Sequence, residues 1–484
     1  MRRQDIQLLA SARQGDIAAR CEVGRRYLLG ADGFPHHVAT GLDYLSHPSV
    51  KQLPEAARII AESLPLQELL SLQQEPALAQ AARAGSALAS AKLDAWERLR
   101  RGDPLDEPSL SALQADGAID VAAVLLIAVQ RAFAEGDLAR VCSSLALALA
   151  LSDELTPELA ESVAAAVRLA EAKGEAVQGI AAEALIDSLD QRAAQGDRDA
   201  AYALGRGFCG IECGAFGDDV FAERQNMRRG AAFLLRAADG GCDDAWLHLY
   251  RLHADHRLSV ANPQMARFFL EKAAARGQAE AQRKLGALML RESASLATSE
   301  QAIDWLHQAA SQGDAPAKEL LESLVLPVEG RDEEAVSAIE QIRRSDPWLA
   351  TRLELAREFG LTKLEALCMD PAEGLRPWGI VVGKNPFIAQ SRLSAPRAVP
   401  ATSETALAAA RQAASLFGQA RREALAVEGD LRRRSVRQRR AFEKHSLDDA
   451  MFFANATSMT LESLRLGPKW AFRARQPLRT ALAS

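Results

Sequence analysis

Residues 230–249 read GAAFLLRAADGGCDDAWLHL, residues 266–285 read ARFFLEKAAARGQAEAQRKL, and residues 302–321 read AIDWLHQAASQGDAPAKELL. The three stretches begin 36 residues apart, and each has a small residue, an aromatic-Leu pair three residues later, and two consecutive alanines before a glycine. Spacings of three and four residues place these side chains on one face of a helix. A glycine can then adopt the left-handed conformation that ends the helix. Each stretch therefore predicts one helix, a tight turn and the start of a second helix.

The turn belongs to a longer pattern, Ala-x2-Gly-x3-Ala-x3-(Leu/Val), which occurs six times in the chain. Its glycines are Gly15, Gly85, Gly196, Gly241, Gly277 and Gly313. The two long gaps between them are close to two and three periods, and Gly136 and Gly174 are candidates for altered copies inside the longer gap. A fixed period of this length is the signature of a solenoid, in which stacked helix pairs supply one another's hydrophobic core.

The N-terminal copy carries further small and aromatic positions. It runs Ala19-x3-Val23-Gly24-x2-Tyr27-x2-Gly30-x2-Gly33-Phe34-Pro35 and continues as Gly41-x2-Tyr44-Leu45. The Leu-Gly pair returns at Leu204-Gly205 and Leu285-Gly286. These residues resemble the Sel1-like repeat, a relative of the tetratricopeptide repeat, clearly over residues 12–48 and 193–324 and weakly over 49–192.

The resemblance implies an all-α fold, a right-handed α-solenoid of Sel1-like helix pairs. It also implies an adaptor that presents a concave groove to peptides or to a folded partner, often within bacterial signalling or secretion assemblies. Because the repeated positions serve packing, partner specificity is expected to come from other side chains on the inner helices.

Beyond the array, five prolines between residues 371 and 400 predict a Pro-rich extended segment, in which residues 378–383 form the strand-like run. Helical patterns before and after it predict a helical cap and a C-terminal helical tail. The expected domains are an N-terminal repeat (1–48), degenerate helical repeats (49–192), regular repeats (193–325), the cap (326–370), the extended segment (371–402) and the tail (403–484).

Charge also divides the chain. From residue 345 onward there are 22 Lys and Arg against 14 Asp and Glu, whereas the rest of the chain is acidic. The basic residues concentrate at Arg432, Arg433, Arg434, Arg437, Arg439 and Arg440. We expect this cluster either to be a solvated helix face or to bind a partner: an acidic protein, nucleic acid, an anionic membrane surface or the acidic array of the same chain. Since no aromatic residues alternate with the arginines, stacking on bases is not indicated.

Catalytic motifs are missing from the sequence, which has no Gly-x-Ser-x-Gly, no phosphate-binding loop and no His-Glu-x-x-His. Cys209, Cys213 and Cys242, with His248, His253 and His256, suggest a metal site, but Cys-x3-Cys is not the usual knuckle spacing and thiols are common core fillers. Residues 355–369 loosely resemble a helix-turn-helix, although Glu365 and Asp370 would oppose phosphate. We therefore predict no enzyme activity, no cofactor and no metal.

The first thirty residues lack an apolar export core, and the most apolar run, residues 121–133, is shorter than a membrane span. The sequence therefore predicts a cytoplasmic protein with reduced thiols and no transmembrane segment, although peripheral membrane association stays open. The predicted function is a bacterial protein-protein interaction scaffold, with the basic tail as a second binding element. The alternatives are a regulatory nucleic-acid-binding protein and an assembly factor for secretion or polysaccharide export.

Overall fold

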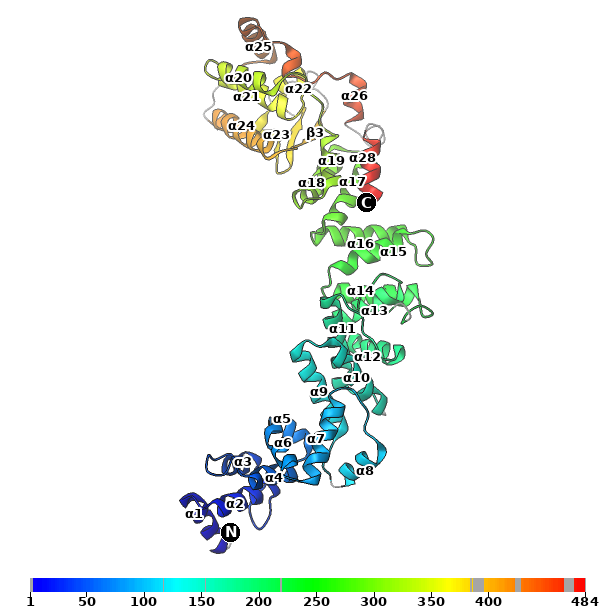
Figure 1. The fold of residues 1–484 in the computed structure, drawn as a ribbon. Coiled ribbons are helices and arrows are strands. Elements are labelled where there is room, and N and C mark those ends of the chain that lie inside the picture. The colour runs from blue at the N-terminus through cyan, green and yellow to red at the C-terminus, as the bar shows by residue number, and fades with distance from the viewer. Residues whose placement is uncertain are drawn as a thin grey trace. The chain divides into compact units, whose positions relative to one another are not determined.

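The computed structural model describes residues 3–115, 117–152, 154–217, 220–383, 385, 396–422, 428–464 and 474–483. The chain forms two compact units, the first comprising residues 1–245 and 258–260 and the second comprising residues 246–257 and 261–484. Helices dominate both units, and the strands that the structure describes lie in the second (Figure 1). Among the described residues, none of the helices is both long and apolar enough to cross a lipid bilayer.

The first unit is built of consecutive short helices that pack in sequence order. They are α1 (Arg3–Gln14), α2 (Ile17–Leu29), α3 (Val38–Leu45), α4 (Pro54–Ser63), α5 (Leu66–Ser71), α6 (Glu75–Arg83), α7 (Ala87–Leu99), α8 (Glu107–Ala115), α9 (Val121–Glu135), α10 (Leu138–Leu151), α11 (Pro157–Lys173), α12 (Ala182–Ala194), α13 (Arg198–Phe208) and α14 (Met227–Asp239). The next helix, α15 (Asp244–Ala254), begins in this unit and continues in the second.

The second unit completes the repeats and adds a mixed module. Its repeat helices are α16 (Pro263–Ala275), α17 (Ala279–Glu292), α18 (Leu296–Ser311) and α19 (Ala315–Glu322). The module contains α20 (Asp332–Arg343), α21 (Pro347–Glu358), α22 (Lys363–Cys368), α23 (Pro371–Gly374), α24 (Glu404–Arg422), α25 (Leu431–His445), the 3-10 turn η2 (Asp449–Met451) and α26 (Ser458–Ser463). The last described helix is α28 (Arg475–Ala483).

The turn glycines adopt the left-handed conformation that the sequence pattern predicts. At the six predicted positions φ lies between +85° and +98°, the left-handed region that favours glycine. In each turn the glycine N–H donates to the carbonyl three residues back, and the following N–H donates to the carbonyl five residues back, as in Gly313 to Ala310 and Asp314 to Ala309. Gly136 and Gly174 have φ of 68° and 67° and make the same two bonds. The altered copies therefore keep the turn.

A polar side chain directly after the turn often begins the second helix of each pair. Asp16, Ser86, Asp137, Asp197 and Asp314 each accept a hydrogen bond from the backbone N–H three residues on. Such N-caps satisfy one of the amides that a helix start leaves unpaired. One short stretch therefore ends one helix and starts the next.

Small residues let the second helix of a glycine-turn pair approach the next helix in the chain to backbone contact. A Cβ on Gly286 of α17 would lie 2.8 Å from the carbonyl oxygen of Ala302 on α18 and 2.8 Å from Cγ of Leu306. The pair α13–α14 repeats this arrangement with Gly205 facing Leu234, where an added Cβ would lie 2.7 Å from the leucine Cγ. The pair α2–α3 does so again at Gly24, Gly41 and Leu45: a Cβ on Gly24 would lie 2.6 Å from Leu45 Cγ and 3.1 Å from the Gly41 carbonyl oxygen. In each case the glycine of one helix packs against the small residue and the leucine of the next helix.

The prolines of residues 371–402 do not produce only irregular chain. Strands β1 (Leu375–Arg376), β2 (Gly379–Val382) and β3 (Arg397–Pro400) form an antiparallel sheet in that order, with Ile380 opposite both Leu375 and Val399. The predicted strand-like run 378–383 contains β2. Pro386 lies outside the described residues.

One hydrophobic core joins the segments that the sequence divided into cap, extended segment and tail. It contains Leu353 of α21, Val399 of β3, Ala410 of α24 and Phe442 of α25, all buried. Residues 335–453 therefore contribute to one module in which the sheet packs among helices. The all-α solenoid is confirmed, with this small sheet added to it, whereas the right-handed superhelix and the domain boundaries stay predictions.

The backbone contact between paired helices makes Gly286→Ala destabilising. Its Cβ would collide with the backbone of Ala302, and such overpacking costs about 1–3 kcal/mol. The matched control is Gly418→Ala in α24, where the nearest atom to the new Cβ is 3.9 Å away, so the better helix propensity of alanine raises stability by up to ~1 kcal/mol. Urea and thermal unfolding of the full chain measure both. Equal effects of the two substitutions would contradict the close contact.

Candidate partner-binding surfaces

The arginine cluster predicted as a binding element lies on α25, but its members do not share one environment. Arg432, Arg433, Arg439 and Arg440 are exposed to solvent, whereas Arg434 and Arg437 are partly buried. The cluster therefore divides into a solvent-facing stripe and an inward-facing pair.

The inward pair binds other parts of the same module. Arg434 Nη1 donates to the carbonyl of Leu367 at 2.9 Å, and its Nη2 lies 3.6 Å from Glu428. Arg437 lies 2.8 Å from Asp346, the N-cap of α21. Burial and the nearby Arg352 guanidinium lower the pKa of Arg434. Two of the six arginines therefore contact other parts of the module, and binding of a partner by the cluster stays a prediction.

Among the exposed arginines, Arg439 lines a groove of ≈ 570 Å³ at the C-terminal end of α25. Lys363, Asp448 and Asp449 also line it, and Lys363 Nζ lies 2.7 Å from Asp449. Both signs of charge therefore meet in this groove, which is not the uniformly basic surface that binds phosphate backbones.

The possible metal ligands do not assemble. Among the described residues, no group of three or more His, Cys, Asp and Glu is placed to hold a metal ion. Cys209 is buried, and its Sγ occupies the space beside Gly230 of α14. Burial raises the pKa of the Cys209 thiol to about 11, and burial likewise raises that of Cys213 to about 11. Both cysteines are therefore protonated near neutral pH, as expected of core fillers.

The helix-turn-helix interpretation fails on burial. Its recognition helix would be α22, whose residues 365–368 are all buried in the module. A helix that enters a DNA groove must expose its side chains to base edges. Segment 355–369 therefore has a packing role.

That role includes a fully buried ion pair. Arg397 of β3 lies 3.0 Å from Glu365 of α22, and both side chains have no exposed surface. Burial opposes ionisation of Glu365, but the charge and hydrogen bonds of Arg397, together with Thr362, outweigh it and lower the pKa of that carboxyl. A second buried pair joins Arg352 and Glu428 through two bonds of 2.7 Å. The two pairs connect helices to segments that follow them in the chain.

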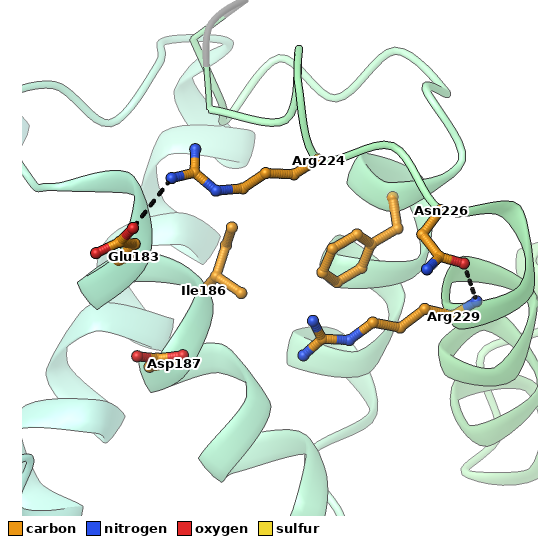
Figure 2. Close-up of a pocket in the computed structure, with 7 residues that line it drawn as sticks. Glu183, Ile186, Asp187, Arg224, Asn226 and Arg229 are labelled. Atoms are coloured by element: carbon orange, nitrogen blue, oxygen red, sulfur yellow. Dashed lines mark hydrogen bonds and ion pairs between the residues drawn. The ribbon is translucent and has the colours of Figure 1, made fainter.

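A more promising surface for a partner is a groove of ≈ 240 Å³ in the first unit, between α12 and the start of α14 (Figure 2). Glu183, Ile186 and Asp187 of α12 have helical spacing and form one wall. Arg224 and Arg229 form the opposite wall. Phe208, the last residue of α13, also lines the groove. The groove thus has an apolar floor and walls of opposite charge.

The basic wall is held in position by local structure. Asn226 caps α14 by accepting a 3.0 Å hydrogen bond from the backbone N–H of Arg229. The Arg229 guanidinium stacks over Phe208, 4.5 Å from the ring centre, and lies 3.1 Å from Asp190. Across the mouth, Arg224 lies 3.3 Å from Glu183. The side chains in both ion pairs are more than a third exposed, so each pair contributes little stability and can be replaced by a partner's charges.

The chain is similar to several solved structures. The chain is similar to a Sel1 repeat protein from Oxalobacter formigenes, at 22% identity over 66% of this chain and 89% of that one, with a TM-score of 0.29. It is also similar to c5321, a protective antigen of uropathogenic Escherichia coli strains that displays an SLR fold, at 17% identity over 99% of this chain and 96% of that one, with a TM-score of 0.27. No family model and no curated protein matches the chain.

The class of protein follows from the chain's own geometry. Consecutive helices are joined by the same glycine turn, and after three of these turns the second helix makes the same small-residue contact with the helix that follows it. The described helices therefore have the glycine turns and small-residue contacts that the resemblance to the Sel1-like repeat implied.

The buried pair makes Arg397→Met strongly destabilising. The substitution leaves Glu365 buried without its cation, which costs about 3–5 kcal/mol in unfolding free energy. The double variant Glu365→Leu/Arg397→Met removes both charges and is expected to recover most of that loss. Chemical unfolding followed by circular dichroism measures both. A double variant as unstable as Arg397→Met would contradict the charge argument.

The ion pair between Glu365 and Arg397 also makes the folding stability of the chain depend on pH in acid. Because the pKa of Glu365 is lower in the folded chain than its ordinary 4.5, the unfolded chain binds more protons in acid. Stability that is present above pH 4.5 is therefore lost as the pH falls through the folded value. Melting temperatures of the wild type between pH 7 and pH 3 should fall in acid, and the double variant should show a shallower fall. Parallel pH profiles would contradict this assignment.

Proposed function

We propose that this chain is a non-enzymatic scaffold that holds a protein partner. The observation that carries the proposal is the groove between α12 and α14, where Ile186 and Phe208 are buried beside exposed, opposed charges. An apolar floor with a few polar groups at its edge is the usual construction of a recognition site. Such a groove suits a peptide segment that inserts one apolar side chain and carries charges of both signs beside it.

The exposed ion pairs support this choice of partner. A partner carboxylate can replace Glu183 beside Arg224, and a partner cation can replace Arg229 beside Asp190. Exchange of one exposed pair for another costs little, so the free energy of binding comes from the partner's apolar side chain, which leaves water when it packs against Ile186 and Phe208. The exposed arginines of α25 are a second contact in this proposal, for an acidic part of the same partner.

A substitution that fills the groove tests the proposal. Asp187 is exposed, so Asp187→Trp places an indole in the groove without disturbing the core. The control is Glu158→Trp, an equally bulky change at an exposed position in the first turn of α11. The tagged full chain is expressed in cells of its source organism, and co-purifying proteins are quantified for the wild type and both variants.

The expected result is a partner retained by the wild type and by Glu158→Trp and reduced at least five-fold by Asp187→Trp. Calorimetry with the purified partner should then show about ten-fold weaker binding, which corresponds to ~1.4 kcal/mol. A partner retained equally by both variants would rule out this groove, and the absence of any specific partner would contradict the scaffold.

A further inference from the structure

The last described helix, α28, lies against the repeat array rather than against the module that precedes it in the chain. It packs on α17 and α19, the helices that follow two successive glycine turns (Figure 1). Its buried residues are Ala474, just before the helix, Leu478 and Ala481, which recur at intervals of four and three. These positions form one apolar face, and Arg475, Gln476, Arg479 and Thr480 are exposed. An amphipathic helix therefore occupies this face of the array.

The repeat array contacts α28 through a buried charged side chain, that of Arg283. The Arg283 side chain of α17 is only 4% exposed, and its Nη1 donates to the carbonyl of Ala481 at 2.7 Å. Ala481 is in the last turn of α28, where the carbonyls have no partner within the helix and carry the negative end of the helix dipole. A charged donor at that place recognises the C-terminal end of a helix, which an apolar surface alone does not do.

Arg283 is also held in position. Its Nε donates to Asp314 Oδ2 at 2.9 Å, while Asp314 Oδ1 accepts from the backbone N–H of Ala317 and caps α19. Asp314, the N-cap of α19, thus fixes the orientation of a guanidinium that belongs to α17. Arg283 is the sixth residue after Gly277, and Leu247 and Glu319 stand at the same place after Gly241 and Gly313. This site is therefore not part of the general repeat pattern.

We propose that α17 and α19 form a docking site for the C-terminal turn of a short amphipathic helix, and that α28 is the chain's own occupant of that site. A partner helix with a small residue, a leucine and a small residue at relative positions 0, 4 and 7 competes with α28 for Arg283. The inference rests on the proposed protein-binding role and adds a second, regulated surface to it. As long as α28 is docked, the site is closed to partners.

The tether explains why α28 holds a site that a separate peptide fills weakly. A linked segment competes at an effective concentration that reaches the millimolar range. An eleven-residue peptide also loses conformational entropy when it becomes helical, since isolated helices of that length are marginal in water. A free peptide therefore binds measurably only after α28 has been displaced.

The test uses the full chain and a fluorescent peptide of residues 474–484, ARQPLRTALAS. Leu478→Asp places a charge on the buried face of α28 and releases it. Anisotropy should show at least ten-fold tighter binding of the peptide to this variant than to the wild type. Adding Arg283→Met should reverse the gain, whereas adding Arg291→Met should not, because Arg291 lies on the same helix with a side chain that is 51% exposed. Circular dichroism checks that each variant is folded.

Equal binding to the wild type and to Leu478→Asp, no binding to either, or binding indifferent to Arg283→Met would overturn the proposal. Hydrogen exchange on the wild-type chain gives a second test that needs no variant. Excess peptide should speed the exchange of the amides of residues 479–483, and unchanged exchange would count against displacement. Because the groove between α12 and α14 lies in the other unit, failure here leaves the Asp187→Trp experiment unaffected.

Discussion

The repeat array depends on the close approach of two helix backbones. At Gly286 of α17 a single added carbon would meet the carbonyl of Ala302 on α18, and the same geometry recurs at Gly205 and Gly24. A backbone contact of this kind fixes how a helix pair crosses, because there is no flexible side chain between the helices to absorb a change. The leucine four residues after the small residue then covers the glycine, so two small residues and one leucine define each contact.

The second unit shows what is built upon such pairs. The module's β3 lies against α18, and Arg376 of β1 reaches Glu300 of the same helix at 2.7 Å. On another face, α28 covers α17 and α19. Buried ion pairs, Arg397 with Glu365 and Arg352 with Glu428, hold the module together, and buried charges of this kind favour one arrangement because any other leaves a charge unpaired. The repeat helices of this unit are thus a support for other segments of the chain.

The array could be predicted from the sequence because its determinants are local. The turn needs a glycine and the crossing needs a small residue, and both recur every 36 residues over 230–321. The N-caps Asp16, Asp197 and Asp314 directly follow the turn glycines, so the sequence also carries a signal for the start of the second helix. Gly136 and Gly174 show that the glycine turn is kept where the surrounding sequence no longer matches the repeat pattern.

The surfaces could not be predicted because their determinants are distant in sequence. In α25, Arg434 and Arg437 differ from their neighbours only through Leu367, Glu428 and Asp346, and no spacing within the cluster reveals those partners. The same holds for Arg283, whose contact with Ala481 spans 198 residues. The groove at α12 could not be predicted because Ile186 and Phe208 have the sequence pattern of ordinary core residues. The central claim, backbone contact between α17 and α18 and at the two corresponding places in the array, is tested most directly by a crystal structure of the full chain. We expect the Cα of Gly286 to lie about 3.3–3.6 Å from the carbonyl oxygen of Ala302, the range of a Cα–H···O contact, and a side chain or a gap between the two helices at that point would contradict the account.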